Sequence, residues 1–265
     1  MKFVLLAVLS GAVTLSAAGG NIESYAKKYW SVWHKNKPVA RKSVKERAAA
    51  DMEYFVQCVK KFAPHWLDEF AAIDRAFGWE KGTYQEIALR GIDYKTTPPP
   101  HECTSWVVMP EFTGGKVMLH KNRDAKSRYL MAVRREVPGK YAWTGIADFG
   151  SSGVNSGMNC HGLAVVMNNG DKTWENRSSG FGTTQIARIL LENCRNADEA
   201  VALLQKIIAE GAYTHGKSGS IWFIADAQTA YVAENTAKRI AVQKITSGFC
   251  VRANMWHLPE LLPYS

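Results

Sequence analysis

The chain is expected to fold as an α+β protein, with helices packed on antiparallel sheets. Between residues 21 and 89, apolar side chains recur three or four positions apart, which is the helical period. After residue 100, short β-branched and aromatic runs separated by turn residues indicate strands. The Pro-rich stretch 96–100 lies between these patterns and can be neither a helix nor a central strand. This order of elements favours a helical segment followed by a layered domain.

Two helices are predicted before the Pro-rich boundary, from Met52 to Val59 and from Trp66 to Phe77, separated by Pro64. Two more are predicted after it, at 183–193 and from the capping residue Asn196 to about Gly211. Strands are expected at 107–119 with a turn at 113–115, then at 141–147, 162–168, 220–226, 230–235, 240–245 and 249–254.

The first 18 residues have the features of a secretory signal. One lysine precedes an apolar run, and small residues follow at 16–18. The run is too short for a confident membrane span, although a retained anchor is the alternative. We therefore expect a secreted or periplasmic protein without stable membrane insertion once the signal is removed.

The formal net charge of +9 is spread over lysines and arginines that lie among acidic residues. This pattern favours solvated helix faces, so no nucleic-acid partner is expected, and a protein that binds anionic envelopes is the alternative. Five cysteines are an odd number, so at least one thiol should stay unpaired in an oxidising compartment. Neither a CxxC nor a His-rich spacing occurs, so no metal and no cofactor are expected.

One segment of the second region carries reactive chemistry. It begins Cys103-Thr104-Ser105-Trp106, turns at Gly114-Gly115 and ends Lys121-Asn122-Arg123-Asp124. The pattern predicts a hairpin in which Cys103 opens the first strand and Asp124 closes the second, at one end of a sheet. From the residues alone, a buried structural cysteine is the competing interpretation.

The ordered motifs resemble the linear amide hydrolases, an N-terminal-nucleophile superfamily. It includes choloylglycine hydrolases, penicillin V acylases and the acyl-CoA:6-aminopenicillanic acid acyltransferases, in which a Cys-Thr pair opens the mature chain and a second strand ends in Asn-x-Asp. Later segments match in the same order: 157–165 leading to Asn168-Asn169, then 231–234, then 251–260 with Asn254. The long segment before Cys103 is similar to the pro-region of the acyltransferase branch, which therefore fits best.

The resemblance implies a four-layer αββα sandwich with a helical pro-region. It also implies a signal peptide at 1–18, a pro-segment at 19–102 that is retained as a small subunit, and a catalytic domain at 103–265. Relatives continue past the Asn254 segment, so this domain is expected to be short at its C-terminal end. Self-cleavage would fall between Glu102 and Cys103.

The resemblance also implies a role for each candidate site residue. Cys103 is the nucleophile, and Asp124 orients its newly formed amine. Asn254 donates to the oxyanion, with Asn169 as a second candidate donor. The residues expected to contact the thiolate or the substrate are Lys121, Arg123 and Asn168, of which Arg123 replaces an apolar or aromatic residue of the relatives.

Self-cleavage has a chemical reason. A cysteine thiol is only slightly ionised at neutral pH, whereas an α-amino group, with a pKa near 7.7 to 8.0, can serve as a base from the same residue. Because His101, His161 and His257 lie near the motifs, a Cys-His mechanism stays open.

The expected function is that of a self-matured cysteine amidohydrolase or acyltransferase. It would act on a small-molecule linear amide or acyl substrate through a Cys103 thioester, with self-association possible. A catalytically inactive secreted binding protein of the same fold is the alternative.

Overall fold

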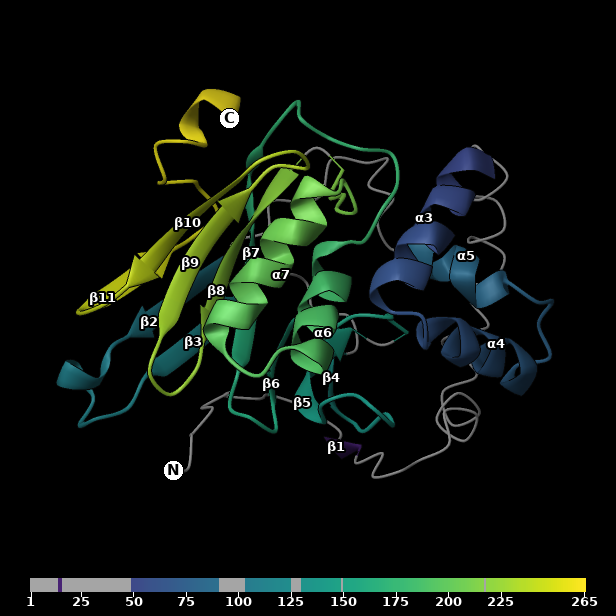
Figure 1. Cartoon of the computed structure of the whole chain (residues 1–265), viewed down its shortest axis with the longest axis horizontal. Coiled ribbons are helices and arrows are strands. Elements are labelled where there is room, and N and C mark those ends of the chain that lie inside the picture. The colour runs from purple at the N-terminus through teal and green to yellow at the C-terminus, as the bar shows by residue number, and fades with distance from the viewer. Residues whose placement is uncertain (1–13, 16–48, 91–102, 125–129, 149, 217) are drawn as a thin grey trace.

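The computed structural model describes residues 14–15, 49–90, 103–124, 130–148, 150–216 and 218–265 (Figure 1). The Pro-rich stretch, His101 and Glu102 lie outside the described residues, as does most of the predicted signal. None of the described helices has the length and apolar character that crossing a membrane requires. The five cysteines are all described, and all are free thiols.

An eight-stranded sheet forms the centre of the fold, in the order β1-β4-β5-β6-β7-β8-β9-β10 (Figure 1). Neighbouring strands are antiparallel except β1 and β4. The strands are β1 (Thr14–Leu15), β4 (Leu130–Arg135), β5 (Trp143–Asp148), β6 (Ser156–Asn159), β7 (Ala164–Lys172), β8 (Ser218–Ala225), β9 (Ala230–Asn235) and β10 (Ile240–Ile245). The short strand β1 falls within the predicted signal segment, and β4 and β6 were not predicted.

A second sheet of three strands packs on one face of the large sheet, against β7 and β8. Its order is β11-β2-β3, from β11 (Phe249–Arg252), β2 (Cys103–Val108) and β3 (Met118–Arg123). The predicted hairpin is confirmed, because β2 pairs antiparallel with β3 from Cys103↔Arg123 to Val108↔Met118. Apolar side chains such as Val107, Phe223 and Val232 fill the space between the two sheets.

Helices α6 (Thr183–Asn193) and α7 (Ala197–Ala209) cover the other face of the large sheet, where they contact strands β6 to β9. Both helices were predicted. The cap is confirmed as well, since Asn196 Oδ1 accepts a hydrogen bond of 2.9 Å from the main-chain nitrogen of Glu199.

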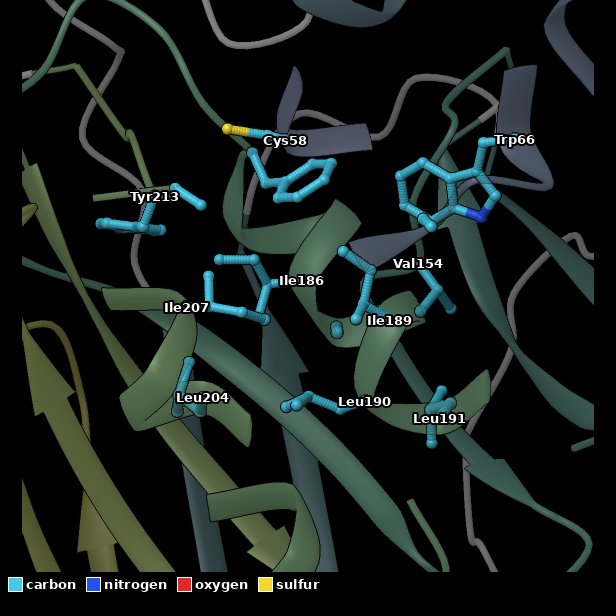
Figure 2. Packing of buried hydrophobic residues seen from close by; sticks show 14 of the residues in the cluster. Cys58, Trp66, Val154, Ile186, Ile189, Leu190, Leu191, Leu204, Ile207 and Tyr213 are labelled. Carbon is cyan, nitrogen blue, oxygen red and sulfur yellow. The ribbon is translucent and has the colours of Figure 1, made fainter. Parts of the chain in front are cut away.

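The helices of the predicted pro-segment are α3 (Ala49–Phe62), α4 (Trp66–Ala76) and α5 (Thr83–Arg90). They lie beside α6 and share its apolar core (Figure 1). Figure 2 shows Cys58 and Trp66 from these helices close to Ile186 and Ile189 of α6. All but two residues of α6 are buried, because α6 is covered by the sheet on one side and by α3 and α4 on the other.

The layered α+β class is confirmed, and three of the four expected layers lie in the described residues. These layers are the helix pair, the large sheet and the three-stranded sheet. The outer face of the small sheet carries exposed Phe249, Val251 and Met118, with 69%, 45% and 40% of their surface accessible. In the described ranges this face is therefore largely open to solvent. Because β11 pairs antiparallel with β2, the end of β11 lies beside the start of β2.

Candidate active site at the start of β2

Cys103 is the first residue of β2, and its thiol points toward the large sheet. Along β2, Cys103, Ser105 and Val107 are buried and alternate with partly exposed residues, as expected of a strand packed on one face. Only 7% of Cys103 is accessible. The sequence-based expectation that a cysteine opens a strand at the end of a sheet is confirmed.

The main-chain nitrogen of Cys103 is held by Asn254, which follows β11. That nitrogen donates a hydrogen bond of 2.7 Å to Asn254 Oδ1. The other end of the same amide, Nδ2, donates to the main-chain oxygen of Asn169 at 2.8 Å. Asn254 thus links the start of β2 to β7, using its oxygen toward Cys103 and its nitrogen toward the large sheet.

Asn168, on β7 of the large sheet, is hydrogen-bonded to all three strands of the small sheet or the residues that follow them. Its side chain is completely buried. Oδ1 accepts from Ser105 Oγ at 2.7 Å and from Lys121 Nζ at 2.6 Å. Nδ2 donates to the main-chain oxygens of Arg252 and Ala253 at 3.1 and 2.8 Å. Both donors and both acceptors of the amide are used, so Asn168 acts as a structural junction in this arrangement.

Lys121 supplies a positive charge beside the thiol. It lies on the same face of β3 as Leu119, which packs into the core between the sheets. Burial lowers the pKa of Lys121 below its usual value, whereas Coulombic attraction and a hydrogen bond to Cys103 act in the opposite direction. The structure therefore brings Lys121 to the expected place, in contact with both Cys103 and Asn168.

Arg123 is the direct ladder partner of Cys103. Its Nη1 donates to Asp148 Oδ1, at the end of β5, at 2.9 Å. Asn155 Nδ2 donates to the other carboxylate oxygen, Oδ2, at 3.2 Å. About a third of each side chain of the ion pair is accessible, so the pair lies at the edge of the site.

Two expected partners point elsewhere in the uncut chain. Asp124 is exposed, and both of its carboxylate oxygens accept from Asn122 Nδ2 at 2.9 Å. Asn169 Oδ1 lies 3.0 Å from His215 Nε2. His215 in turn contacts Thr183 at the start of α6, so the Asn169 side chain is on the helix side of the large sheet. Adjacent residues of a strand face opposite sides, so Asn168 and Asn169 cannot both face the small sheet. Only the main-chain oxygen of Asn169 reaches Asn254.

The two described histidines near the motifs have other contacts. His161 is exposed and packs edge-on against Tyr141. His257 is also exposed, and its main-chain nitrogen donates to Glu234. In the described ranges, no three His, Cys, Asp or Glu side chains gather as metal ligands would. The groups near Cys103 are amides and one ammonium, which suit a thiol reacting with a carbonyl.

Sequence reasoning missed Glu234, a completely buried carboxylate on β9 that contacts the segment carrying Asn254. A signal for it was present in the sequence. Glu234 follows Tyr231-Val232-Ala233 in an apolar strand, and a glutamate is seldom fully buried without a partner.

These layers are those of the N-terminal-nucleophile hydrolase fold class, in which helices cover stacked antiparallel sheets. A family model described as acyl-coenzyme A:6-aminopenicillanic acid acyl-transferase matches residues 112–261. The chain belongs to this family. The match begins after Cys103, so it covers Asn168, Asn254 and Lys121 but not the expected nucleophile. A comparison with curated protein sequences gave no match.

Three solved structures are similar to this chain at low sequence identity. The Caenorhabditis elegans ortholog of N-acylethanolamine-hydrolyzing acid amidase shares 18% identity over 58% of this chain and 71% of its own, with a TM-score of 0.46. A mutant conjugated bile acid hydrolase from Clostridium perfringens shares 14% sequence identity. The match covers 60% of this chain and 54% of the hydrolase, with a TM-score of 0.42. Penicillin V acylase from Agrobacterium tumefaciens shares 19% sequence identity. The match covers 54% of this chain and 49% of the acylase, with a TM-score of 0.37. The chain thus spans about half the length of the two bacterial enzymes.

Proposed function

We propose that the chain is a self-processing cysteine amidohydrolase or acyltransferase that acts on linear carbon-nitrogen bonds through a thioester on Cys103. One observation carries the proposal: the nitrogen and the thiol of Cys103 are each held by a separate polar group, Asn254 and Lys121. Membership of an acyltransferase family supports the general chemistry. Export from the cytoplasm by the leader at 1–18 is part of the same proposal.

Maturation begins when the thiol of Cys103 attacks the carbonyl carbon of Glu102. The carbon-nitrogen bond breaks and the acyl group moves to sulfur, which leaves a free amine on Cys103. Water then hydrolyses the thioester, giving a carboxylate on Glu102 and regenerating the thiol. The main-chain nitrogen that donates to Asn254 becomes this amine, so Asn254 is already placed on the leaving nitrogen.

Turnover uses the same atoms. The free amine takes the proton of the Cys103 thiol, and the thiolate attacks the substrate carbonyl. The tetrahedral intermediate collapses, the substrate amine leaves with a proton, and a thioester stays on sulfur. Water or a second amine then takes the acyl group. Lys121 stabilises the thiolate, and Asn254 is the proposed donor to the oxyanion, a role for which its Nδ2 must leave Asn169.

Asp124 and Asn169 have conditional roles in this scheme. Orientation of the new amine by Asp124 requires the carboxylate to leave Asn122 after cleavage. A donor role for Asn169 requires its side chain to turn from His215. These contacts favour the second candidate function, an inactive binding protein of the same fold, because they leave both residues turned away from Cys103.

Turnover of a panel of linear amides separates the two functions. Purified wild type is expected to release amine and to carry a transient acyl adduct, seen as added mass on the peptide that begins at Cys103. Cys103→Ala should show neither. Cys160→Ala removes an exposed thiol that no part of the mechanism uses, and it should behave as wild type. Release of amine by Cys103→Ala, or no turnover by wild type, would support the binding-protein alternative.

A further inference from the structure

Glu234 faces the space between the two sheets. It lies on β9 two residues after Val232, which belongs to the core between the sheets, so both side chains are on that face. Its neighbour Ala233 packs on the helix side instead. None of the Glu234 surface is accessible to solvent. A carboxylate in this position needs partners that compensate its loss of hydration.

The partners of Glu234 lie on both sides of Asn254 in the sequence. Oε1 accepts from Arg252 Nε at 2.9 Å. Oε2 accepts from the main-chain nitrogens of His257 and Leu258, each at 2.8 Å. One carboxylate therefore holds the chain two residues before Asn254 and three to four residues after it.

The same segment is held from the large sheet by neutral and charged contacts. Asp171 Oδ2 accepts from the main-chain nitrogen of Trp256 at 2.7 Å. The Trp256 ring lies so close to Gly170 and Gly219 that a Cβ atom there would come within 2.4 and 2.2 Å of it. In this segment, Asp171 and the two glycines contact Trp256, which follows Asn254. The Glu234 carboxylate binds residues both before and after Asn254.

The negative charge of Glu234 matters because all three of its partners are donors. A glutamine has one acceptor oxygen, and its NH₂ group would face a donor in place of the second oxygen. Either Arg252 or the two main-chain nitrogens would lose their acceptor, and buried donors rarely stay unpaired. The turn from 252 to 258 would then shift, and Asn254 would move relative to Cys103.

We propose that Glu234 is a positioning residue, which sets Asn254 against the nitrogen of Cys103 by fixing the chain on both sides of it. The catalytic part of this inference rests on the proposed function. A shift of about 1 Å in a reacting group can cost roughly 100-fold in rate, so Glu234 is expected to affect catalysis without touching the substrate.

The test compares Glu234→Gln with Glu175→Gln. Glu175 is a matched control because it is also buried, and it holds Thr236 and Arg239 in the turn between β9 and β10. In Glu234→Gln, self-cleavage and kcat should fall about 10- to 100-fold while KM changes less than about threefold. Glu175→Gln should lose thermal stability but keep wild-type cleavage and kcat.

A second readout does not depend on catalysis. Hydrogen exchange of the peptide covering 252–258 should be about tenfold faster in Glu234→Gln and unchanged in Glu175→Gln. If wild type neither cuts itself nor hydrolyses amides, the proposed function fails, and this exchange still decides the role of Glu234. Wild-type protection of 252–258 in Glu234→Gln would overturn the inference.

Glu234→Asp covers the case in which the Gln variant does not fold. Aspartate keeps the charge opposite Arg252 but is one methylene shorter, so its oxygens withdraw from His257 and Leu258. Faster exchange at 252–258 together with a reduced kcat is the expected result. Wild-type exchange and wild-type kcat in Glu234→Asp would overturn the inference as well.

Discussion

The polar cluster around Asn168 and the polar cluster between α4 and α6 are both buried, but they differ in charge. At the first, the side-chain amides of Asn168 and Asn254 and the ammonium of Lys121 lie beside Cys103 at the junction of the two sheets. At the second, Arg188 lies between two carboxylates, Glu69 at 2.6 and 3.0 Å and Glu192 at 2.7 Å. The first is composed mainly of groups that can exchange partners, and the second of paired charges.

The charged cluster joins the predicted pro-segment to the domain that carries Cys103. Glu69 belongs to α4 and Arg188 to α6, and the guanidinium carbon lies 4.6 Å from the centre of the Trp66 ring. Trp66 Nε1 and His65 Nε2 also contact Glu192, at 3.1 and 2.9 Å. Mutually paired charges therefore join α4 to α6, whereas hydrogen bonds from uncharged amides and one lysine surround Cys103.

Arg188→Met is expected to have the largest effect. It removes the shared partner of Glu69, which keeps Arg135, and of the buried Glu192, and breaking a buried ion pair typically costs about 3 to 5 kcal/mol of stability. Urea unfolding should show this loss, and the pro-segment should separate from the rest after cleavage, as size-exclusion chromatography would reveal. Arg134→Met removes an exposed ion pair with Glu136 and should cost less than about 1 kcal/mol. Equal losses in the two variants would contradict the structural role of the charged cluster.

Asn254→Ala tests the other cluster. Loss of an oxyanion donor typically lowers the rate about 100- to 1,000-fold, and this variant also removes the contact to the Cys103 nitrogen. Stability should fall much less than in Arg188→Met. The exposed Asn176 serves as the control, and Asn176→Ala should keep the wild-type kcat. Turnover of Asn254→Ala at the wild-type rate would exclude a role in the reaction.

Acidification should weaken the helix cluster selectively. Burial raises the pKa of the Glu192 carboxyl, but Arg188 and His65 lower it more, so it falls to about 2 from an ordinary 4.5. The pKa of Glu69 is also lowered by Arg135 and Arg188, against the effect of burial. A carboxylate with a depressed folded-state pKa contributes stability above pH 4.5 that is lost as the pH falls toward 2.

The expected loss from Glu192 is on the order of 3 kcal/mol over that range. It is measured as the urea midpoint at several pH values. Glu192→Gln should be less stable than wild type at pH 6 and should vary less with pH below 4.5, since it lacks this titrating group. An equally steep pH dependence in both proteins would show that the carboxylate does not carry the effect.

Lys121→Met should have the smallest of these effects. It removes the ammonium beside the thiol, whereas Asn168 Oδ1 keeps its hydrogen bond from Ser105. We expect a decrease in kcat of roughly tenfold, comparable to other single charge removals near a reacting group, and slower alkylation of Cys103 by iodoacetamide. Lys116→Met, in the exposed turn before β3, is the control. A faster alkylation in Lys121→Met would reverse the role assigned to the lysine.

Much of the fold was predictable because its signals are local. The cap at Asn196 fixes the start of α7, and alternating or continuous apolar runs mark β9 and β10. Strand β6 was missed because its four residues, Ser156–Asn159, include a glycine and lack β-branched side chains. Helix α5 was also missed, because its eight residues give only about two turns over which a helical period can be recognised.

The site was predictable in part. The hairpin placed Cys103, Lys121 and Arg123 on neighbouring strands because their register follows from one short connection. The direction of Asn168 and Asn169 was not predictable, since it depends on which face of β7 the small sheet covers. Glu234 contacts the residues on both sides of Asn254 only because the chain from Arg252 to Leu258 lies against β9 in space, which no local pattern encodes.

The central claim concerns the bond before Cys103, and N-terminal sequencing of the purified protein tests it most directly. Wild type should yield a fragment that begins Cys-Thr-Ser-Trp, and Cys103→Ala should stay uncut at that bond. The same start in both proteins would point to an external protease. An uncut wild-type chain would contradict self-processing at Cys103.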